Sequence, residues 1–402
     1  MKITCVGGGP AALYLSILVK LDEPGHEVTV LERNQEGATY GWGVTFWPDT
    51  LNLLKTHDPE SGRRIGEQAV RWRDGMAQVG DRTATHAGDA GYAIGRHRLL
   101  RTLTRRAQEL GVRTEFGHEV RADVPDADLV VAADGMNSRM RSQHAEHFGT
   151  RITHGNTRFL WLGTTKVFTT FSFAFVPTDH GWIWCYAYGF SSTESTCVIE
   201  CSPSTWSGLG LDTMEHAACL RLLEQQFASL LGGHPLISRA DRMRDGQNWQ
   251  PFRTLTNRNW SHGNSVLLGD AAHTTHFSIG AGTALALQDA VALARQLRTV
   301  PERGLGPALS HYEKERKRAL LPVQSAARHS AQWYENLPRY LRLPPEQMFA
   351  LLGQRHSPLL PHVPPGLYYR LDRVVSQADS LRRFKRWLGP HIGKVAQQIS
   401  RP

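Results

Sequence analysis

The sequence predicts an α/β fold in which a domain built on a parallel sheet is interrupted by an antiparallel β-sheet domain and followed by C-terminal helices. Three observations predict it: a glycine-rich turn near the N-terminus, a β-rich stretch at 151–254, and helical patterns from residue 283 onward. A chain of 402 residues can bury a large core and is expected to form about two domains. Its hydrophobic content of 41% and charged content of 21% are typical of globular proteins.

The N-terminal segment has the order of a Rossmann-like dinucleotide-binding unit. An apolar run, Lys2–Val6, is followed by the turn Gly7–Ala12, a helical pattern, and a second apolar run that ends at Glu32 and Arg33. Strand, Gly-x-Gly-x-x-Ala turn, helix, strand and acid follow one another as such a unit requires. The first glycine is expected to make the tight turn, the second to let a pyrophosphate approach, and the acid to bind a ribose.

A second signal lies at residues 268–283. An apolar run ends in Gly269-Asp270, a polar loop follows, and Gly280-Ala281-Gly282 opens an amphipathic helix. A carboxylate at a strand end can bind a sugar-like hydroxyl, and a helix N-terminus can receive negative charge through free backbone N–H groups. This arrangement suits a flavin, with Asp270 at the ribityl chain and the helix start near the charge of the reduced ring.

A third signal lies between the other two. The apolar run Asp128–Ala133 ends in Asp134-Gly135, and Ser138 and Arg141 complete the spacing Asp-Gly-x-x-Ser-x-x-Arg. Alone, this spacing would indicate a strand followed by an ordinary Asx turn. Its position, behind the glycine-rich turn and before Gly269-Asp270, favours a functional motif.

The order of the elements suggests how the chain divides. We expect residues 1–60, 90–150 and 255–325 to form the dinucleotide-binding domain and residues 326–402 to form a helical region. Residues 61–89 and 151–254 are expected to form a substrate-binding β-sheet domain, with a strand at 165–167 among others. Several runs there alternate with period two, which suits an antiparallel sheet with one buried face.

The three motifs together resemble those of the single-component, FAD-dependent aromatic hydroxylases of the p-hydroxybenzoate hydroxylase type. A closer resemblance is to salicylyl-CoA 5-hydroxylase and anthraniloyl-CoA monooxygenase. It is carried by the segments Gly41–Leu51, Trp161–Lys166, Val198–Cys201, His276–Gly280 and Trp333–Asn336. The violacein-pathway tryptophan hydroxylase is similar at residues 41–44 and 276–280.

The resemblance implies bound FAD, NADH or NADPH as co-substrate, and oxygen transfer from O₂ to an aromatic ring through a flavin C4a-hydroperoxide. The implied substrate is an aryl-CoA thioester, with salicylyl-CoA converted to gentisyl-CoA. A free aromatic or indolic substrate such as tryptophan is the alternative. A flavoprotein oxidase or dehydrogenase that inserts no oxygen is the alternative of another class.

The motifs and the resemblance assign candidate site residues. The residues expected to bind FAD are Gly7, Gly9, Pro10, Ala11, Ala12, Glu32, Arg33, Arg96, Asp134, Asp270, Gly280, Gly282, Thr283 and Ala284. Arg96 opens an Arg-x-x-Leu-x-x-x-Leu helix, where related hydroxylases place a flavin-binding arginine; a surface arginine is the alternative. The substrate-pocket candidates are Trp42, Val44, Phe46, Trp184, Tyr188 and Phe277, and core packing is the alternative for each aromatic one. His276 and Tyr186 are candidates to assist deprotonation of a substrate hydroxyl.

Composition narrows the partners. The net charge of +9 and pI near 9.5 favour polyanionic small molecules such as FAD, NAD(P)H and CoA esters, although solvated helix faces account for most basic residues. No nucleic-acid motif, metal-ligand spacing or apolar run of membrane-spanning length is found, so none of these partners is expected. A strand that begins at residue 2 and five cysteines without a C-x-x-C pair suggest a reduced, cytoplasmic protein. The oligomeric state is not predicted.

Overall fold

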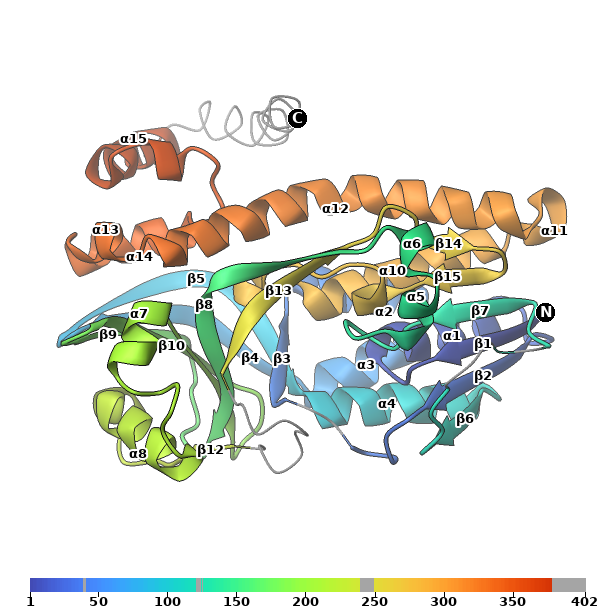
Figure 1. The fold of residues 1–402 in the computed structure, drawn as a ribbon, viewed down its shortest axis with the longest axis horizontal. Helices are drawn as coiled ribbons and strands as arrows, with labels where there is room; N and C mark the ends of the chain where they lie inside the picture. Colours follow the sequence, from blue (N-terminus) through green and yellow to red (C-terminus); the bar gives the residue numbers. More distant parts are fainter. Residues whose placement is uncertain (39–40, 121–123, 125, 239–248, 378–402) are drawn as a thin grey trace.

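The computed structural model describes residues 1–38, 41–120, 124, 126–238 and 249–377 (Figure 1). The predicted α/β fold is confirmed: within these residues, one sheet has six strands and the other has nine. The two sheets lie towards opposite ends of the long axis in Figure 1, and a long helix, α12, runs over both. No helix in the described part of the chain is long and apolar enough to cross a membrane.

The six-stranded sheet carries the predicted dinucleotide-binding unit. Its order is β14-β15-β7-β1-β2-β6, and the five strands from β15 to β6 are parallel. The strands are β1 (Lys2–Val6), β2 (Glu27–Glu32), β6 (Arg113–Phe116), β7 (Leu129–Ala132), β14 (Ser261–His262) and β15 (Ser265–Leu267). The three predicted motifs follow β1, β7 and β15, which are neighbours, so their carboxyl ends meet at one edge of the sheet.

Helix α1 (Pro10–Asp22) explains why this sheet is stable. Every residue from Ala11 to Val19 is buried, because the helix packs against α10 (Gly282–Leu297) and α4 (Arg96–Glu109) as well as the sheet. A helix that is apolar on all sides is stable only in such a covered position.

The nine-stranded sheet forms the other half of the molecule. Its order is β12-β8-β11-β10-β9-β4-β5-β3, and β13 also pairs with β8. The strands are β3 (Gly43–Phe46), β4 (Val70–Val79), β5 (Arg82–Gly95), β8 (Arg151–Thr164), β9 (Phe171–Thr178), β10 (Gly181–Gly189), β11 (Ser195–Cys201), β12 (Leu236–Ile237) and β13 (Gln250–Thr256). Residues 165–167 are not a strand, so that prediction is wrong. The chain leaves the sheet after Thr164, whose hydroxyl accepts a hydrogen bond from the backbone N–H of Lys166.

The remaining helices connect and cover the sheets. They are α2 (Pro48–His57), α3 (Pro59–Gln68), α5 (Arg139–Gln143), α6 (Ala145–Phe148), α7 (Pro203–Gly208), α8 (His216–Gln226), α9 (Ala228–Leu231), α11 (Val300–Arg303), α12 (Leu305–Glu335), α13 (Pro338–Leu341), α14 (Pro345–Gly353) and α15 (Pro365–Gln377), with 3₁₀ turns η2 (Gly269–Ala271), η3 (Phe277–Ile279) and η4 (Leu360–His362). The predicted C-terminal helical region is therefore present through residue 377.

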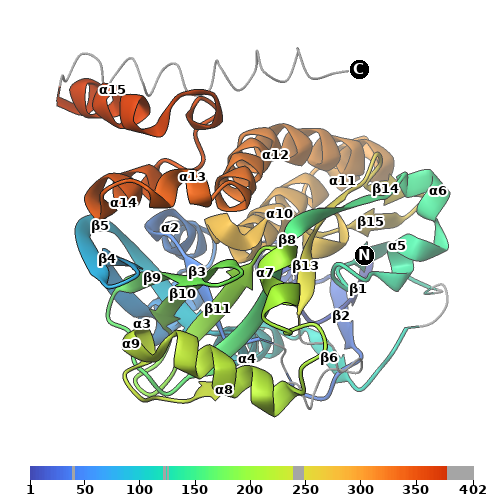
Figure 2. The same ribbon diagram turned by 60° about the vertical axis from the view of Figure 1, so that its left-hand side comes forward.

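The centre of the nine-stranded sheet is buried on both faces, not on one as period-two alternation suggested. On β10, Ile183 and Cys185 point into a cluster with α8 and α9, whereas Trp184 and Tyr186 point into a cluster with α12, α13 and α14. Figure 2 shows the two sets of helices on opposite sides of the strands. We call the second side the aromatic face. How the chain divides into folding units remains a prediction, although β3 pairs with β5 and so joins the larger sheet.

Candidate functional site

The glycine-rich turn has the geometry of a nucleotide-binding turn. Gly7 has a φ of +104°, and a Cβ there would lie 2.4 Å from the carbonyl oxygen of Ala133, so no other residue fits without strain. A Cβ on Gly9 would meet nothing within 4 Å. Gly9 caps α1 without a side-chain hydrogen bond, so the first N–H groups of this helix face open space. Such a helix start is a ready site for a phosphate group.

Glu32 is fixed against this turn. Its Oε2 accepts a hydrogen bond from the backbone N–H of Gly8 at 2.6 Å, and its Oε1 accepts one from the N–H of Asn34 at 2.8 Å. A Cβ on Gly8 would lie 3.0 Å from Glu32 Cβ, so the middle glycine permits this close contact. Arg33, the next residue, is exposed.

Asp270 and Arg96 lie close enough for each to influence the ionisation of the other. The Asp270 side chain is solvent-accessible, yet the protein around it raises its pKa by desolvation, and Arg96 acts in the opposite direction. Burial likewise lowers the pKa of Arg96, against the attraction of Asp270 and Glu32. A carboxylate that is both accessible and surrounded lies in a concave surface. In the described part of the chain, the Arg96 guanidinium makes no hydrogen bond or ion pair, so it is available to a ligand.

Residues of the motif Asp134–Arg141 contact the loops that carry the other two motifs. Arg141 is buried, and its guanidinium donates to the backbone oxygen of Ala271 at 3.0 Å and to that of Met136 at 2.6 Å. Asp134 Oδ2 accepts a hydrogen bond from the N–H of Arg139 at 2.7 Å. Asp134 Oδ1 is buried beside Gly7 and has no hydrogen-bond partner among the described residues. Arg141 therefore holds the loop after β7 against the loop after β15.

Helix α10 begins with exposed backbone donors. Gly280 has a φ of +62°, Ala281 caps the helix without a side-chain hydrogen bond, and no acidic residue lies in the first turn. Thr283 is half-buried and Ala284 is buried. A Cβ on Gly280 would lie 2.8 Å from Thr45 Oγ1, so β3 packs against this loop.

His276 is a neutral residue in this structure. Its side chain is buried, its Nδ1 lies 2.9 Å from Ser278 Oγ, and the N–H of Ser278 points at the same nitrogen. Burial, reinforced by Arg355, lowers the pKa of His276 to about 3. Such a histidine is a poor base near neutral pH.

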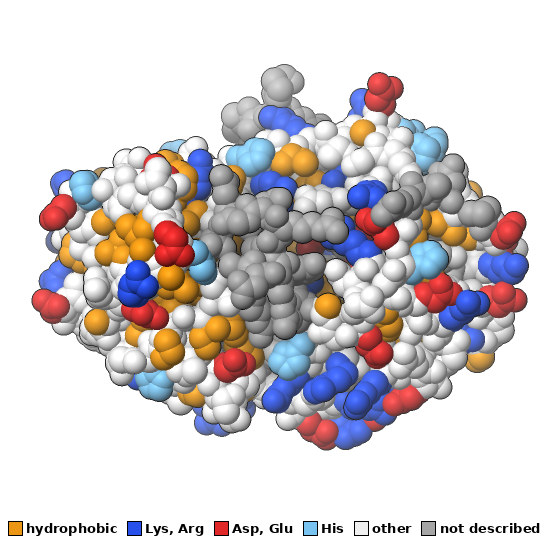
Figure 3. All heavy atoms as spheres, turned by 60° about the horizontal axis from the view of Figure 1, so that its bottom comes forward, with side chains coloured by type: hydrophobic (Ala, Val, Ile, Leu, Met, Phe, Trp, Pro, Cys, Tyr) orange, Lys and Arg blue, Asp and Glu red, His pale blue; other side chains and the backbone are white. Residues whose placement is uncertain are grey.

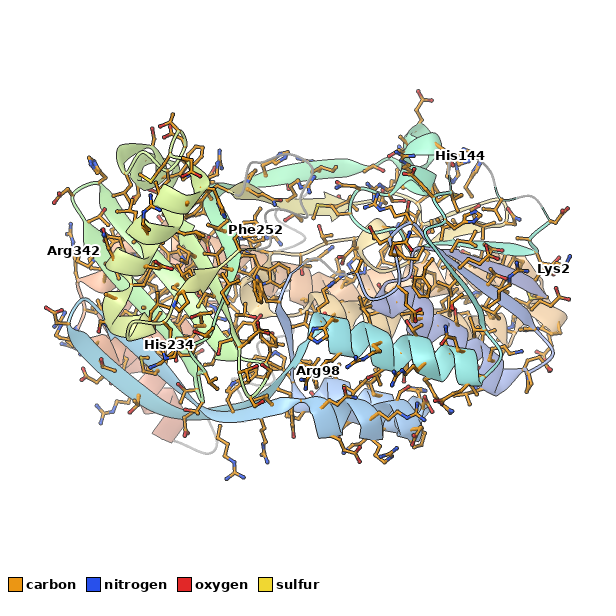
Figure 4. All side chains as sticks on the ribbon, turned by 90° about the horizontal axis from the view of Figure 1, so that it is seen from below. Lys2, Arg98, His144, His234, Phe252 and Arg342 are labelled. Carbon is orange, nitrogen blue, oxygen red and sulfur yellow. The ribbon has the colours of Figure 1, made fainter. Side chains whose placement is uncertain are left out.

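Phenylalanines connect the His276 loop to the aromatic face. Phe252 of β13 lies between the two sheets in Figure 4. The centroid of its ring is 4.1 Å from that of His276 and 4.0 Å from that of Phe277. The Phe277 ring in turn lies 5.6 Å from the ring of Tyr186. This side of the aromatic face therefore borders the loop that precedes α10.

Tyr186 does not stand alone on that face. Its hydroxyl donates to Oε2 of Glu200, a residue of β11 that is 0% exposed. Trp184 Nε1 donates to the same oxygen at 3.2 Å, and the hydroxyl of Thr157 donates to Oε1 at 2.5 Å. Burial raises the pKa of Glu200 to about 7, although the three hydrogen bonds oppose the shift.

The six predicted pocket residues do not share one cluster. Val44 and Phe46 belong to the core around the six-stranded sheet. Trp42 and Tyr188 pack with Trp72 and Phe190 in a separate aromatic cluster. Trp184 lies on the aromatic face, and Phe277 packs against it. Phe277 lies in the loop before α10 and contacts Tyr186, whereas Val44 and Phe46 flank Thr45, which packs against Gly280 of the same loop.

The residues present fit a flavin dinucleotide. Gly9, Gly135 and Gly282 all face open space at the ends of β1, β7 and β15, and the starts of α1 and α10 are uncapped. An unpartnered guanidinium, a recessed carboxylate and an orphaned carboxylate oxygen border the same region. Two free helix N-termini suit a pyrophosphate and the pyrimidine edge of a reduced ring.

Comparisons with known proteins agree with this geometry. Residues 123–326 match a family model described as an FAD binding domain. The chain is 37% identical over 356 residues to the salicyloyl-CoA 5-hydroxylase of Streptomyces sp, a match that covers 85% of this chain and 67% of the relative. It is 35% identical over 338 residues to the 3-hydroxy-4-methyl-anthranilyl-[aryl-carrier protein] 5-monooxygenase of Streptosporangium sibiricum, covering 84% of this chain and 90% of the relative.

A solved structure shows the same fold. That of 2-methyl-3-hydroxypyridine-5-carboxylic acid oxygenase superimposes with a TM-score of 0.68 at 18% sequence identity, covering 84% of this chain and 92% of the other. Fold, site and sequence similarity together define a flavoprotein that oxidises aromatic compounds. The chain belongs to the family of FAD-dependent aromatic monooxygenases, with FAD as its cofactor and NAD(P)H as co-substrate.

Several residues of the site were not found from the sequence. Gly8 was passed over because only the outer glycines of the motif were given roles. Arg141 completed the middle motif, but its contact with Ala271 depends on the distance between two loops. Glu200 lies in the segment Val198–Cys201, which carried the closer resemblance, and that segment was the available signal.

Proposed function

We propose that the chain hydroxylates the aromatic ring of an aryl-CoA thioester, with salicylyl-CoA as substrate and gentisyl-CoA as product. The observation that carries this proposal is the similarity to two enzymes named for thioester-linked substrates. One acts on a salicyloyl thioester and the other on an anthranilyl thioester, so each substrate has a donor group ortho to the carbonyl. Such a donor group makes the para position electron-rich, as ring hydroxylation requires.

Within this proposal, FAD binds along the ends of the parallel strands. Its pyrophosphate contacts the turn Gly7–Ala12 and the start of α1, and Glu32 binds the ribose. Arg96 and Asp270 bind the ribityl and phosphate region, and Gly282, Thr283 and Ala284 present N–H groups to the pyrimidine edge. Arg33, Asp134 and Gly280 complete the set, although Arg33 is exposed and offers the weakest support.

In this proposal, the aromatic side chains beside α10 surround the reacting ring of the substrate. Bound FAD supplies the oxygen atom, taken from O₂, with electrons from NAD(P)H. Phe252, Phe277 and Tyr186 wall the region beside α10 and exclude water from it. Tyr186 accepts a proton or hydrogen bond from the ring hydroxyl, which raises the electron density of the ring.

A basic groove could receive the phosphates of coenzyme A. A pocket of about 380 Å³ between α3 and α4 is lined by Arg64, Gln68, Arg101, Thr102, Arg105 and Glu109. Arg101 and Arg105 are exposed, lie one helical turn apart, and pair with no described residue. Figure 3 shows basic side chains gathered at the lower edge of this face, and Figure 4 shows Arg98 near the start of α4. Arginine binds phosphate well because its donors form a planar fork.

The test is a substrate screen with product analysis. The purified, FAD-containing protein is given NADH or NADPH, ¹⁸O₂, and one of four compounds: salicylyl-CoA, salicylate, tryptophan, or a salicylyl group on a carrier protein. We expect salicylyl-CoA to stimulate NAD(P)H oxidation and to gain one labelled oxygen para to its hydroxyl.

The other outcomes are distinct. Hydroxylation of free salicylate or tryptophan, with the CoA ester ignored, would contradict the thioester proposal. Hydroxylation of the carrier-bound group alone would replace CoA by a protein-linked thioester. Stoichiometric hydrogen peroxide without labelled product from any aromatic compound would contradict hydroxylation by this chain.

A further inference from the structure

Glu200 lacks a structural reason for its position. It is the central carboxylate of the aromatic face, 0% exposed, and no described cation forms an ion pair with it. Its cross-strand neighbours are Trp184 on β10 and Phe159 on β8. A buried charge of this kind costs stability, and an apolar side chain of similar size would suit the surroundings better. Such groups are concentrated at functional sites.

In every hydrogen bond at the Glu200 side chain, the carboxylate is the acceptor. Three donors, the Thr157 hydroxyl, the Trp184 indole N–H and the Tyr186 hydroxyl, point at its two oxygens. An ionised carboxylate is an acceptor only, so this set matches the ionised form. Tyr186 has one hydroxyl hydrogen, and it is committed to Glu200. The Tyr186 oxygen can therefore only accept a hydrogen bond from a ligand beside it.

We propose that Glu200 is a positioning residue that makes Tyr186 the acceptor for the ring hydroxyl of the substrate and takes up the proton that this hydroxyl releases. This inference rests on the proposed function. The transfer is balanced: the substrate O–H bond breaks as a proton passes to the Tyr186 oxygen, while the Tyr186 proton passes to Glu200 Oε2. The products are a substrate phenolate, a neutral Tyr186 and a neutral Glu200. No oxidant or further reactant is needed.

The surroundings suit this transfer. Tyr186 lies beside Phe277, which precedes α10, and beside Tyr334 of α12 at a ring distance of 5.7 Å. The charged and titratable groups that act on the pair are Glu335 and Tyr334 of α12, and Arg355 after α14 acts in turn on Tyr334 and His276. Arg158 points to the other face of the sheet, over Trp206. Glu335 raises the pKa of Glu200, and His276 is neutral. Because the pKa of Glu200 is about 7, the carboxylate is ionised at mildly alkaline pH and can accept a proton.

The test compares Glu200→Gln with the wild-type holoenzyme, using salicylyl-CoA and measuring the rate of labelled-product formation from pH 5.5 to 9. Wild type should lose activity as the pH falls through about 7, because Glu200 becomes protonated. Glu200→Gln should lack this acidic limb and be about 10- to 100-fold slower at pH 8, at or below the lower end of a general-base contribution. Tyr186→Phe should give the same flat profile, and the double variant should be no slower than either single one.

A spectroscopic readout separates this role from a structural one. Bound salicylyl-CoA should show phenolate absorbance at pH 8 in wild type but not in Glu200→Gln. A fluorinated ring with a more acidic hydroxyl should recover most of the lost rate in the variant. Glu335→Gln is the matched control: this carboxylate is exposed, and its loss should only lower the midpoint of the acidic limb slightly.

Two results would overturn the proposal. One is an unchanged acidic limb in Glu200→Gln, whether or not the overall rate falls. The other is full phenolate absorbance in that variant. If the wild-type enzyme hydroxylates no thioester, the proposed function is wrong. The role of Glu200 can then still be tested by the phenolate absorbance of whichever substrate the enzyme does hydroxylate.

Discussion

Under the proposed function, the two ends of the molecule recognise their ligands in different ways. At the edge of the six-stranded sheet, most of the proposed contacts would come from backbone N–H groups beside glycines, with a few more from side chains such as Glu32 and Asp270. On the aromatic face, the backbone is occupied by strand pairing, and only side chains such as Tyr186 and Glu200 remain available. A site whose contacts come from the backbone tolerates few amino-acid substitutions and suits a cofactor common to many proteins. A site whose contacts come from side chains can be adapted by substitution to one substrate.

The largest effect is expected from the tightest backbone position. Gly7→Ala places a Cβ 2.4 Å from the Ala133 oxygen at a φ of +104°, so it should destabilise the protein by at least about 2 kcal/mol and abolish FAD binding. Gly9→Ala is the matched control, since its φ of −76° suits alanine and no protein atom lies within 4 Å. It should fold normally in thermal unfolding yet lose FAD. Full FAD binding by Gly9→Ala would mean that Gly9 does not face the cofactor.

The stability of Glu200→Gln should depend on pH. The folded-state pKa of Glu200, about 7, lies above the unfolded value of about 4.5, so its contribution to stability is present below pH 4.5 and is lost as the pH rises through 7. Glutamine does not titrate. The variant should therefore gain up to about 3 kcal/mol relative to wild type between pH 4.5 and 8, measured by urea unfolding of the apoprotein. A pH-independent difference would show that the pKa of Glu200 is the same in the folded and unfolded states.

Asp270→Ala tests whether a side chain also contributes to FAD binding at the edge of the six-stranded sheet. Removing a hydrogen bond to a charged group costs about 1.5–3 kcal/mol, so FAD affinity should fall about 10- to 100-fold. Fluorescence titration of the apoprotein with FAD measures this. Asp179→Ala, an exposed acid between β9 and β10, should leave the affinity unchanged. Full affinity in Asp270→Ala would remove Asp270 from the flavin site.

The smallest effect is expected at the basic groove. Arg101→Ala combined with Arg105→Ala should raise KM for salicylyl-CoA a few-fold at low salt, and the difference should shrink at high ionic strength because exposed charges are screened. The salicylyl ester of pantetheine, which lacks the nucleotide, should show no change. Arg221→Ala with Arg303→Ala removes the same charge from exposed positions elsewhere. An equal rise in KM in that control would assign the effect to net charge, not to the groove.

The sequence predicted the backbone geometry at the ends of the parallel strands better than the packing of the aromatic face, and the reason is physical. The turn after β1 requires Gly7 because of its φ angle, and a rule that depends on local backbone conformation is visible in the sequence. The Asp270 and Arg96 positions also follow from local motifs. Tyr186 and Glu200, by contrast, meet through the register that pairs β10 with β11, and Phe277 joins them only through the tertiary fold.

The predicted substrate pocket shows the same limit. Trp42 comes just before β3 and packs against Tyr188, which shares a face of β10 with Trp184 but lies four residues further along the strand. The two tryptophans therefore belong to clusters at different points along the sheet. Alternation alone could not reveal that α8 and α9 bury the second face. The strand expected at 165–167 failed because β propensity does not show where a chain leaves its sheet.

Helix α12 has a consequence for protein engineering. At about 1.5 Å per residue its 31 residues span about 46 Å, and along this length it contacts α10 and η3 before its last turn supplies Trp333 and Tyr334 to the aromatic face. A chimera that exchanged only the strands of the larger sheet with those of a relative would pair foreign strands with the original helix and leave Trp184 facing the wrong ring. To alter substrate preference without disturbing the flavin site, the exchanged region should therefore include the strands, the end of α12, α13 and α14.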